Sequence, residues 1–369
     1  MKMERMNKFF QSRWGMVSVG LSIGILASTL QKLGNPKNMG ICVACFERDI
    51  AGSLGLHRAA PVQYIRPEII GFVLGAMIAA FLFREYRARV GSAPIIRFML
   101  GFFAMVGALV FLGCPWRALL RLAGGDGNAI LALVGLVCGV ALGVLFIKRG
   151  YNLGRSQKAS PVVGAVMPLI MIGLLLLLII KPVLSSGAPF FSTEGPGSQH
   201  ANYLVALGIA VVIGFIAQRT RFCTMGAIRD VILMRDFHLM SGVVALLAGA
   251  FIMNLIYGQA HWGFAGQPVA HTNQLLNFGG MLLAGLCFAL AGGCPGRQLF
   301  LSGEGDGDAA VFVLGMIVGA AFAHNFTTAG TPYPNNPANW GWGPAAIIVG
   351  LVFCVVIGLT MRGTATSRV

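Results

Sequence analysis

The chain has 369 residues, of which 56% are hydrophobic and 11% charged. Soluble proteins carry about 25% charged residues, so this composition excludes a soluble globular protein and indicates that a lipid bilayer surrounds the chain. The net charge of +15 does not indicate nucleic-acid binding, because the basic residues lie between apolar stretches, where they are typical of cytoplasmic loops.

Ten apolar stretches follow one another along the chain and predict an all-α integral membrane protein with one membrane domain over residues 1–369. We expect the first stretch to be an uncleaved helix and not a signal peptide, because the second half contains its counterpart. Several stretches fall short of the roughly 20 residues of a full crossing, and their glycines favour broken or re-entrant helices. The stretches are 14–31, 67–83, 95–112, 129–147, 161–180, 203–217, 239–257, 277–292, 309–324 and 344–361.

The distribution of basic residues predicts cytoplasmic N- and C-termini. Loops 258–274 and 325–343 contain no Lys or Arg and are expected outside, whereas the loops expected inside are rich in Arg. The stretch between the first two helices departs from this rule, so either it folds back into the membrane or the count of crossings is wrong there. Its basic residues are Lys32, Lys37, Arg48 and Arg58.

An internal repeat is the strongest signal in the sequence. Residues 113–129 read GCPWRALLRLAGGDGNA and residues 293–309 read GCPGRQLFLSGEGDGDA. A weaker pair precedes it, because Cys42 is followed by Arg48-Asp49 and Cys223 by Arg229-Asp230 at the same spacing. Each half holds five stretches, and an odd number predicts two inverted-topology repeats, 14–180 and 203–361, as in many transporters and channels.

The repeated cysteines are the candidate substrate pathway. Cys114 and Cys294 follow Gly113 and Gly293 and precede a proline, so we expect the helix to break there and turn free backbone amides toward an anion. Arg117 and Arg297 strengthen that positive field, and a polarizable thiol suits sulphur or selenium. Cys42 and Cys223 form a second equivalent pair, expected nearer the two mouths. The alternative is that a cysteine is simply a small residue that membrane helices tolerate. We interpret the three unrepeated cysteines, Cys138, Cys287 and Cys354, in this way.

Two carboxylates in the repeated loops, Asp126 and Asp306, have three candidate roles. They carry a coupling proton, neutralise Arg117 and Arg297, or cap a water-exposed loop. The neighbours Arg48-Asp49 and Arg229-Asp230 are expected to form local ion pairs at helix ends.

The sequence predicts no metal and no cofactor. Cys42 and Cys45 make a lone Cys-x-x-Cys, which lacks the second pair or the histidines that zinc requires. No phosphate-binding glycine loop is present.

The motifs resemble the YeeE/YedE membrane family of sulphur transport, above all CTMGAIRD at 223–230 and AGGCPGR at 291–297. The GCPWR and GGCPGRQLFLSGEGDGD runs are similar to the YedE-type subgroup associated with selenium. The resemblance implies a bacterial inner membrane protein, an hourglass of two funnels, and substrate passage by thiol–sulphur contacts. The implied pathway residues are Cys42, Cys114, Cys223 and Cys294.

The function predicted from the sequence is uptake of a small selenium or sulphur oxyanion or related compound, not enzymatic catalysis, with a cytoplasmic acceptor protein as a candidate partner. One alternative is a membrane thiol-disulfide oxidoreductase that uses Cys42 and Cys45. Another is a sulphur-transfer protein that holds a persulfide.

Overall fold

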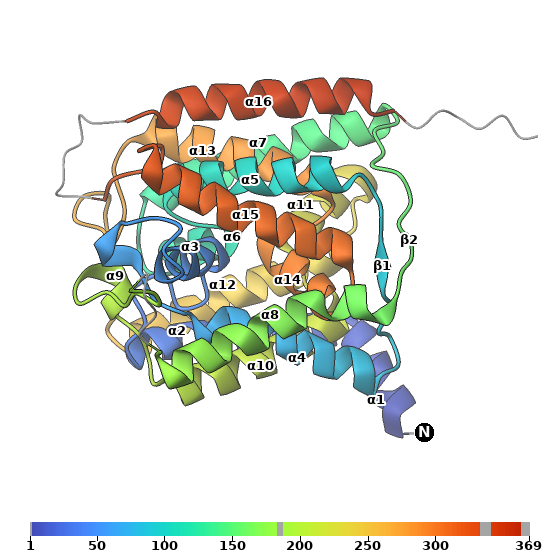
Figure 1. The fold of residues 1–369 in the computed structure, drawn as a ribbon, viewed down its shortest axis with the longest axis horizontal. Coiled ribbons are helices and arrows are strands. Elements are labelled where there is room, and N and C mark those ends of the chain that lie inside the picture. The colour runs from blue at the N-terminus through green and yellow to red at the C-terminus, as the bar shows by residue number, and fades with distance from the viewer. Residues whose placement is uncertain (1, 183–186, 333–340, 363–369) are drawn as a thin grey trace, which may run out of the picture.

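The computed structural model describes residues 2–182, 187–332 and 341–362 (Figure 1). Ten of its helical segments are long and apolar enough to cross a membrane, and strands are limited to β1 (Arg89–Val90) and β2 (Gln157–Lys158) in the described ranges. The chain is an all-α integral membrane protein, as predicted. The long helices are α2 (Arg13–Lys32), α4 (Pro67–Leu82), α5 (Pro94–Phe111), α7 (Asn128–Lys148), α8 (Pro161–Ile180), α10 (Tyr203–Thr220), α12 (His238–Ile256), α13 (Gln274–Ala291), α15 (Gly307–Asn325) and α16 (Gly343–Thr360).

Four short helices follow breaks in the chain: α3 (Val43–Ser53), α6 (Pro115–Ala123), α11 (Thr224–Met234) and α14 (Pro295–Gly303). The last three each follow a long helix directly, so the expected broken helices are present. Every residue of α3 is buried, including Arg48. The part of the stretch around Arg48 that departed from the charge rule therefore folds back into the protein.

The two halves have the same order of helices: long, short, long, long, short, long, long. Corresponding helices make corresponding contacts with the other half. α2 packs against α12, and its counterpart α10 packs against α4, which is the counterpart of α12. Likewise α7 packs against α13 while α15 packs against α5. A two-fold axis that relates the halves produces this pattern. The opposite orientation of the repeats 14–180 and 203–361 in the membrane stays a prediction.

Glycines allow these paired helices to touch backbone to backbone. A Cβ added at Gly20 of α2 would clash with the carbonyl of Gly242 on α12. At the equivalent crossing, a Cβ on Gly75 of α4 would clash with the carbonyl of Val211 on α10. Small residues are what close packing between membrane helices requires, so the high glycine content contributes to a tightly interlocked bundle.

The loops gather at two ends of the bundle. α1 (Lys2–Gln11), β1 and β2 lie at the right of Figure 1, whereas α9 (Gly195–Ser198) and the turn Ala60–Val62 lie at the left. The amide of Asn152 donates to the carbonyl of Met361 at 3.0 Å, so the end of α16 is also at the right. We call the end of the bundle at the right of Figure 1 the basic end, and the end at the left the opposite end. The basic end carries Arg84, Arg87, Arg89, Lys148, Arg149, Arg155, Lys158, Arg219 and Arg221.

Candidate functional site

Each of the four repeated cysteines is the N-cap residue of a short helix: Cys42 of α3, Cys114 of α6, Cys223 of α11 and Cys294 of α14. Proline follows Cys114 and Cys294 at the first helical position, where it costs no hydrogen bond. All four thiols are buried. They therefore lie at the positive ends of helices. The Gly-Cys-Pro motifs predicted this position for Cys114 and Cys294.

Contacts between the thiols join cysteines of the same half. The Sγ atoms of Cys42 and Cys114 lie 3.8 Å apart. In the other half, the backbone amide of Cys294 donates to Cys223 Sγ at 3.4 Å. We call Cys42, Cys45 and Cys114 the first thiol cluster, and Cys223 and Cys294 the second thiol cluster. The two clusters occupy equivalent places in the two halves, and each is formed by contacts within its own half.

A buried cation lies beside the first thiol cluster. Arg117 is fully buried, and its Nη1 donates to Cys45 Sγ at 3.7 Å. Its Nη2 donates to the carbonyls of Pro268 and Val269 at 3.2 and 3.0 Å. Among the described residues no carboxylate pairs with Arg117, so its positive charge is opposed only by dipoles. The equivalent Arg297 instead pairs with Glu304 at 2.9 Å.

The aspartates of the repeated loops pair with other arginines. Asp126 contacts Arg121 at 2.6 Å, with both side chains fully buried. Asp306 contacts Arg89 at 2.7 Å and accepts from the amide of Ala309, which caps α15. The hypothesis that these aspartates neutralise Arg117 and Arg297 is therefore wrong, because each carboxylate already holds a nearer guanidinium. Asp306 fits the loop-cap alternative.

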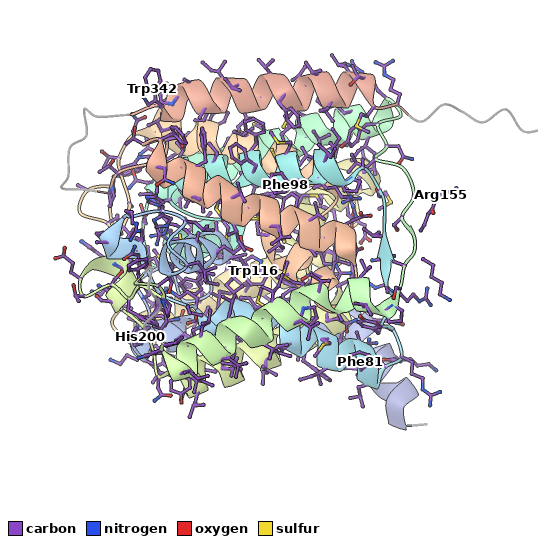
Figure 2. The ribbon with its side chains drawn as sticks, viewed as in Figure 1. Phe81, Phe98, Trp116, Arg155, His200 and Trp342 are labelled. Atoms are coloured by element: carbon purple, nitrogen blue, oxygen red, sulfur yellow. The ribbon has the colours of Figure 1, made fainter. Side chains whose placement is uncertain are left out.

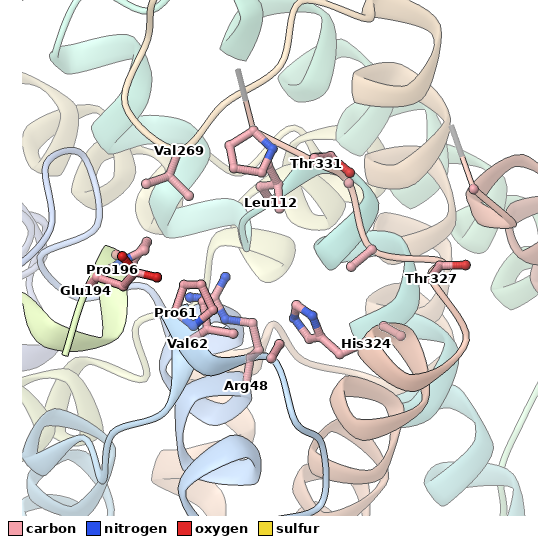
Figure 3. Close-up of a pocket in the computed structure, with 17 residues that line it drawn as sticks. Arg48, Pro61, Val62, Leu112, Glu194, Pro196, Val269, His324, Thr327 and Thr331 are labelled. Carbon is pink, nitrogen blue, oxygen red and sulfur yellow. The ribbon is translucent and has the colours of Figure 1, made fainter. Parts of the chain in front are cut away.

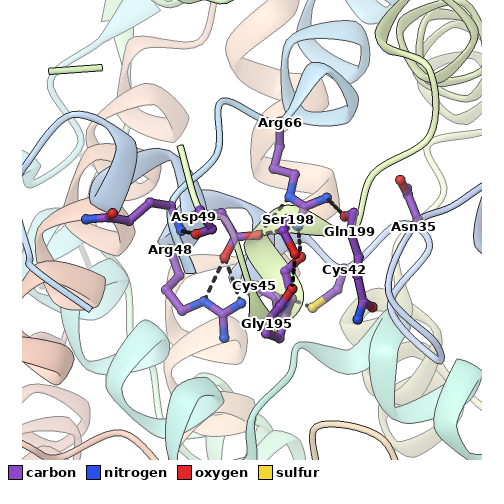
Figure 4. A network of polar contacts seen from close by, with 12 residues as sticks. Asn35, Cys42, Cys45, Arg48, Asp49, Arg66, Gly195, Ser198 and Gln199 are labelled. Atoms are coloured by element: carbon purple, nitrogen blue, oxygen red, sulfur yellow. Dashed lines mark hydrogen bonds and ion pairs between the residues drawn. The ribbon is translucent and has the colours of Figure 1, made fainter. Parts of the chain in front are cut away.

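The predicted ion pairs are present, but they lie in the middle of α3 and α11 and not at helix ends, and one is part of a larger network. Asp49 lies between Arg48 and Arg66, at 2.7 Å from each (Figure 4). Arg66 also donates to the carbonyls of Pro196 and Gln199, so the network ties α3 to the segment before α10. The equivalent pair of Arg229 and Asp230 is 2.8 Å long and more exposed.

Four aromatic rings pack together next to cysteines of both thiol clusters in the sequence. Trp116, two residues after Cys114, contacts Phe72, Phe222 and Phe300 with ring centroids 5.8–6.1 Å apart. Phe222 immediately precedes Cys223. We call these four rings the aromatic barrier. Figure 2 shows Trp116 near the middle of the bundle, between His200 at the opposite end and Arg155 at the basic end.

A pocket opens at each end of the bundle. The opposite-end pocket has a volume of about 650 Å³, and Arg48 and His324 point into it (Figure 3). Leu112 and Val269 also line it. The carbonyl of Leu112 accepts from the thiol of Cys45, and the carbonyl of Val269 accepts from Arg117. The pocket therefore reaches within one residue of the cluster.

The basic-end pocket has a volume of about 500 Å³ and reaches the second thiol cluster directly, because Cys223 lines it. The ionisable side chains that line it, besides Cys223, are Glu85, Arg219, Arg221, Arg229, Arg297 and His238. Arg219 pairs with Glu85 at 2.8 Å. Burial raises the pKa of Glu85, but hydrogen bonds from Gln218 and Arg219 outweigh it, and the pKa lies below its ordinary value. The pocket has an excess of positive charge.

Two residues of this region were missed by the sequence analysis. Glu47 is fully buried in α3, and Trp116 forms the centre of the barrier. Both are positions where the repeats differ, since Glu47 aligns with Ile228 and Trp116 with Gly296. These differences between the two halves were the sequence signal that could have identified both residues. Within the described residues, no three His, Cys, Asp or Glu side chains are grouped so as to hold a metal ion.

A family model described as sulphur transport matches residues 219–368, which include the second thiol cluster. This part of the chain is similar to the sulphur transport family. The resemblance inferred from the motifs is thus confirmed for the C-terminal region.

A curated relative of the chain is the thiosulfate transporter TsuA of Spirochaeta thermophila, 32% identical over 97 residues. The matched segment covers 26% of this chain and 29% of the relative, so the chain spans less than a third of that protein's length.

Proposed function

We propose that the protein is a membrane transporter for the uptake of a small sulphur- or selenium-containing anion through the two thiol clusters. The observation that carries the proposal is a row of features along the bundle. It runs from the opposite-end pocket through the first thiol cluster, the aromatic barrier and the second thiol cluster to the basic-end pocket. An enzyme site needs one entrance, whereas this row has a pocket at each end.

The charges along the row favour an anion. Arg117 supplies a buried positive charge at Cys45, and the helix N-termini at the four cysteines add partial positive charge. A polarizable sulphur or selenium atom suits contact with the thiols. Thiosulfate and selenite combine both properties, and the thiols themselves do not distinguish the two elements.

The positive-inside rule assigns the basic end to the cytoplasm of a bacterial inner membrane. Substrate then enters at the opposite-end pocket and leaves at the basic-end pocket beside Cys223. Both described chain ends lie at the basic end, so the termini are cytoplasmic. A cytoplasmic sulphur or selenium acceptor protein would meet the substrate there.

The test is uptake of labelled thiosulfate and selenite into proteoliposomes that contain wild type, Cys114→Ser or Cys294→Ser. Loss of uptake in both variants, with folding intact, supports a route along the thiols. Cys138→Ser is the matched control, because Cys138 lies on α7 outside both clusters. Uptake that neither serine changes would remove the thiol route.

The same samples test the alternative functions. A reversible disulfide between Cys42 and Cys45, without uptake of either anion, would favour the oxidoreductase. A stable persulfide on an isolated thiol, detected by mass spectrometry, would favour the sulphur-transfer protein.

A further inference from the structure

One carboxyl group in the first half has no counterpart in the second. Glu47 lies on α3, five residues after Cys42, and its side chain is fully buried. Neither carboxyl oxygen has a hydrogen-bond partner among the described residues. A buried polar group without a partner is rare in proteins and calls for an explanation, and at the aligned position the second half has Ile228.

The surroundings of Glu47 contain no cation that is free to pair with it. The thiol of Cys114 is the titratable group that interacts with it electrostatically. On α3 itself, Arg48 is held by Asp49. The groups on the elements that pack against α3 are engaged elsewhere or face other residues: Arg66 contacts Asp49, Glu68 accepts from Asn35, Arg297 pairs with Glu304, Arg117 faces Cys45, and His324 stacks on His57.

Burial without a partner favours the neutral form of the carboxyl group, because an isolated carboxylate is costly in a dry interior. An anion in the first thiol cluster increases that cost, since like charges repel strongly at low dielectric. The anion and a proton on Glu47 therefore favour each other's binding, and this coupling is reciprocal.

We propose that Glu47 is the proton site of the transporter and that one proton moves with each anion. The inference rests on the proposed function and deepens it. Glu47 takes its proton from the water of the opposite-end pocket, which forms the carboxyl O–H bond, and it keeps this proton while the anion occupies the first thiol cluster. The bond breaks once the anion has passed the aromatic barrier, because the displaced rings then admit water from the basic-end pocket, and this water accepts the proton. No electrons are transferred.

The experiment uses proteoliposomes with an internal pH dye, labelled thiosulfate outside, and the membrane potential clamped. For wild type we expect an inward proton gradient to raise accumulation about tenfold per pH unit, together with acidification of the lumen that requires thiosulfate. For Glu47→Gln we expect uptake down the thiosulfate gradient, with no acceleration by the proton gradient and no acidification.

Glu68→Gln is the matched control, because Glu68 is also fully buried but bonds to Asn35 outside both clusters. It should keep the response to the proton gradient. If Glu47→Gln does not fold, infrared difference spectra of wild type replace it. A protonated carboxyl band that shifts when thiosulfate binds supports the inference, and its absence overturns it.

The outcomes separate this inference from the proposed function. Wild-type uptake without proton movement, or proton movement that persists in Glu47→Gln, overturns the role of Glu47 and leaves the transporter. Absence of labelled uptake in wild type at every gradient overturns the transporter itself.

Discussion

The indole ring of Trp116 lies against the backbone of Gly296, the residue at the same place in the other Gly-Cys-Pro motif. A Cβ added at Gly296 would come within 2.6 Å of the ring. The two motifs thus meet at the middle of the protein, and one side chain fills the space of both. The repeat could not be symmetric here, because two tryptophans would overlap.

Removal of Trp116 should open the aromatic barrier. Cys223 lines the basic-end pocket, whereas Cys42 and Cys114 are at most 1% exposed. A membrane-impermeant anionic thiol reagent added at the basic end should therefore modify Cys223 in wild type, and also Cys114 in Trp116→Ala. Peptide mass spectrometry measures the modification.

The control for the barrier is Trp262→Ala, since Trp262 is 62% exposed. It should leave the wild-type labelling pattern unchanged. Equal labelling of Cys114 in wild type and Trp116→Ala would show that the rings do not separate the clusters.

Enlarging Gly296 should displace the barrier. Gly296→Ala overpacks a buried contact, which costs about 1–3 kcal/mol, and we expect slower thiosulfate uptake. The double variant with Trp116→Phe should recover folding, because the smaller ring makes room. Thermal unfolding in detergent and uptake rates measure both effects. Gly173→Ala on α8 is the control, as nothing lies within 4 Å of its added Cβ. An equal loss in both glycine variants would contradict a specific contact.

The two repeated aspartates should differ in their contribution to stability. Asp126→Asn leaves Arg121 buried without a counter-charge, and breaking such a pair costs about 3–5 kcal/mol. Asp306→Asn keeps a good helix cap and loses an ion pair with Arg89, which is 38% exposed, so we expect at most about 1 kcal/mol. Unfolding in detergent measures the difference. A larger loss for Asp306→Asn would overturn this ranking.

Two unrepeated cysteines should be dispensable for transport. Cys287 and Cys354 have their Sγ atoms 3.4 Å apart, on α13 and α16, and neither lines a described pocket. Cys287→Ser and Cys354→Ser should change thiosulfate uptake by less than about twofold, because both side chains, although fully buried, lie outside the thiol clusters and serine has nearly the volume of cysteine. A loss comparable with Cys114→Ser would place these thiols on the route.

The long helices could be predicted from the sequence because lipid demands continuous apolar stretches. The expected stretch 161–180 and α8 have the same bounds, and the others differ by a few residues. The short helices were missed as elements. α3 and α11 contain charged pairs, Arg48-Asp49 buried by protein and Arg229-Asp230 partly exposed, so hydropathy gives no signal for these helices.

The candidate site could be predicted only in part. Repetition identified Cys42, Cys114, Cys223 and Cys294, but equivalence does not determine contact. The approach of Cys42 to Cys114 depends on how α3 folds back, and the partner of Asp126 depends on the turn after α6. Such contacts follow from tertiary packing, which no local pattern encodes.

Helices of one half pack against helices of the other half, and this packing limits how the protein can move. α2 is locked by glycine contacts to α12 of the other half, and α4 to α10 in the same way. Rocking of one repeat against the other, a common form of alternating access, would have to pull these backbones apart. The frame therefore has no hinge between its halves. Motion is left to the short helices and to the rings they carry, so in the proposed transport we expect substrate to advance by local rearrangement within a fixed frame.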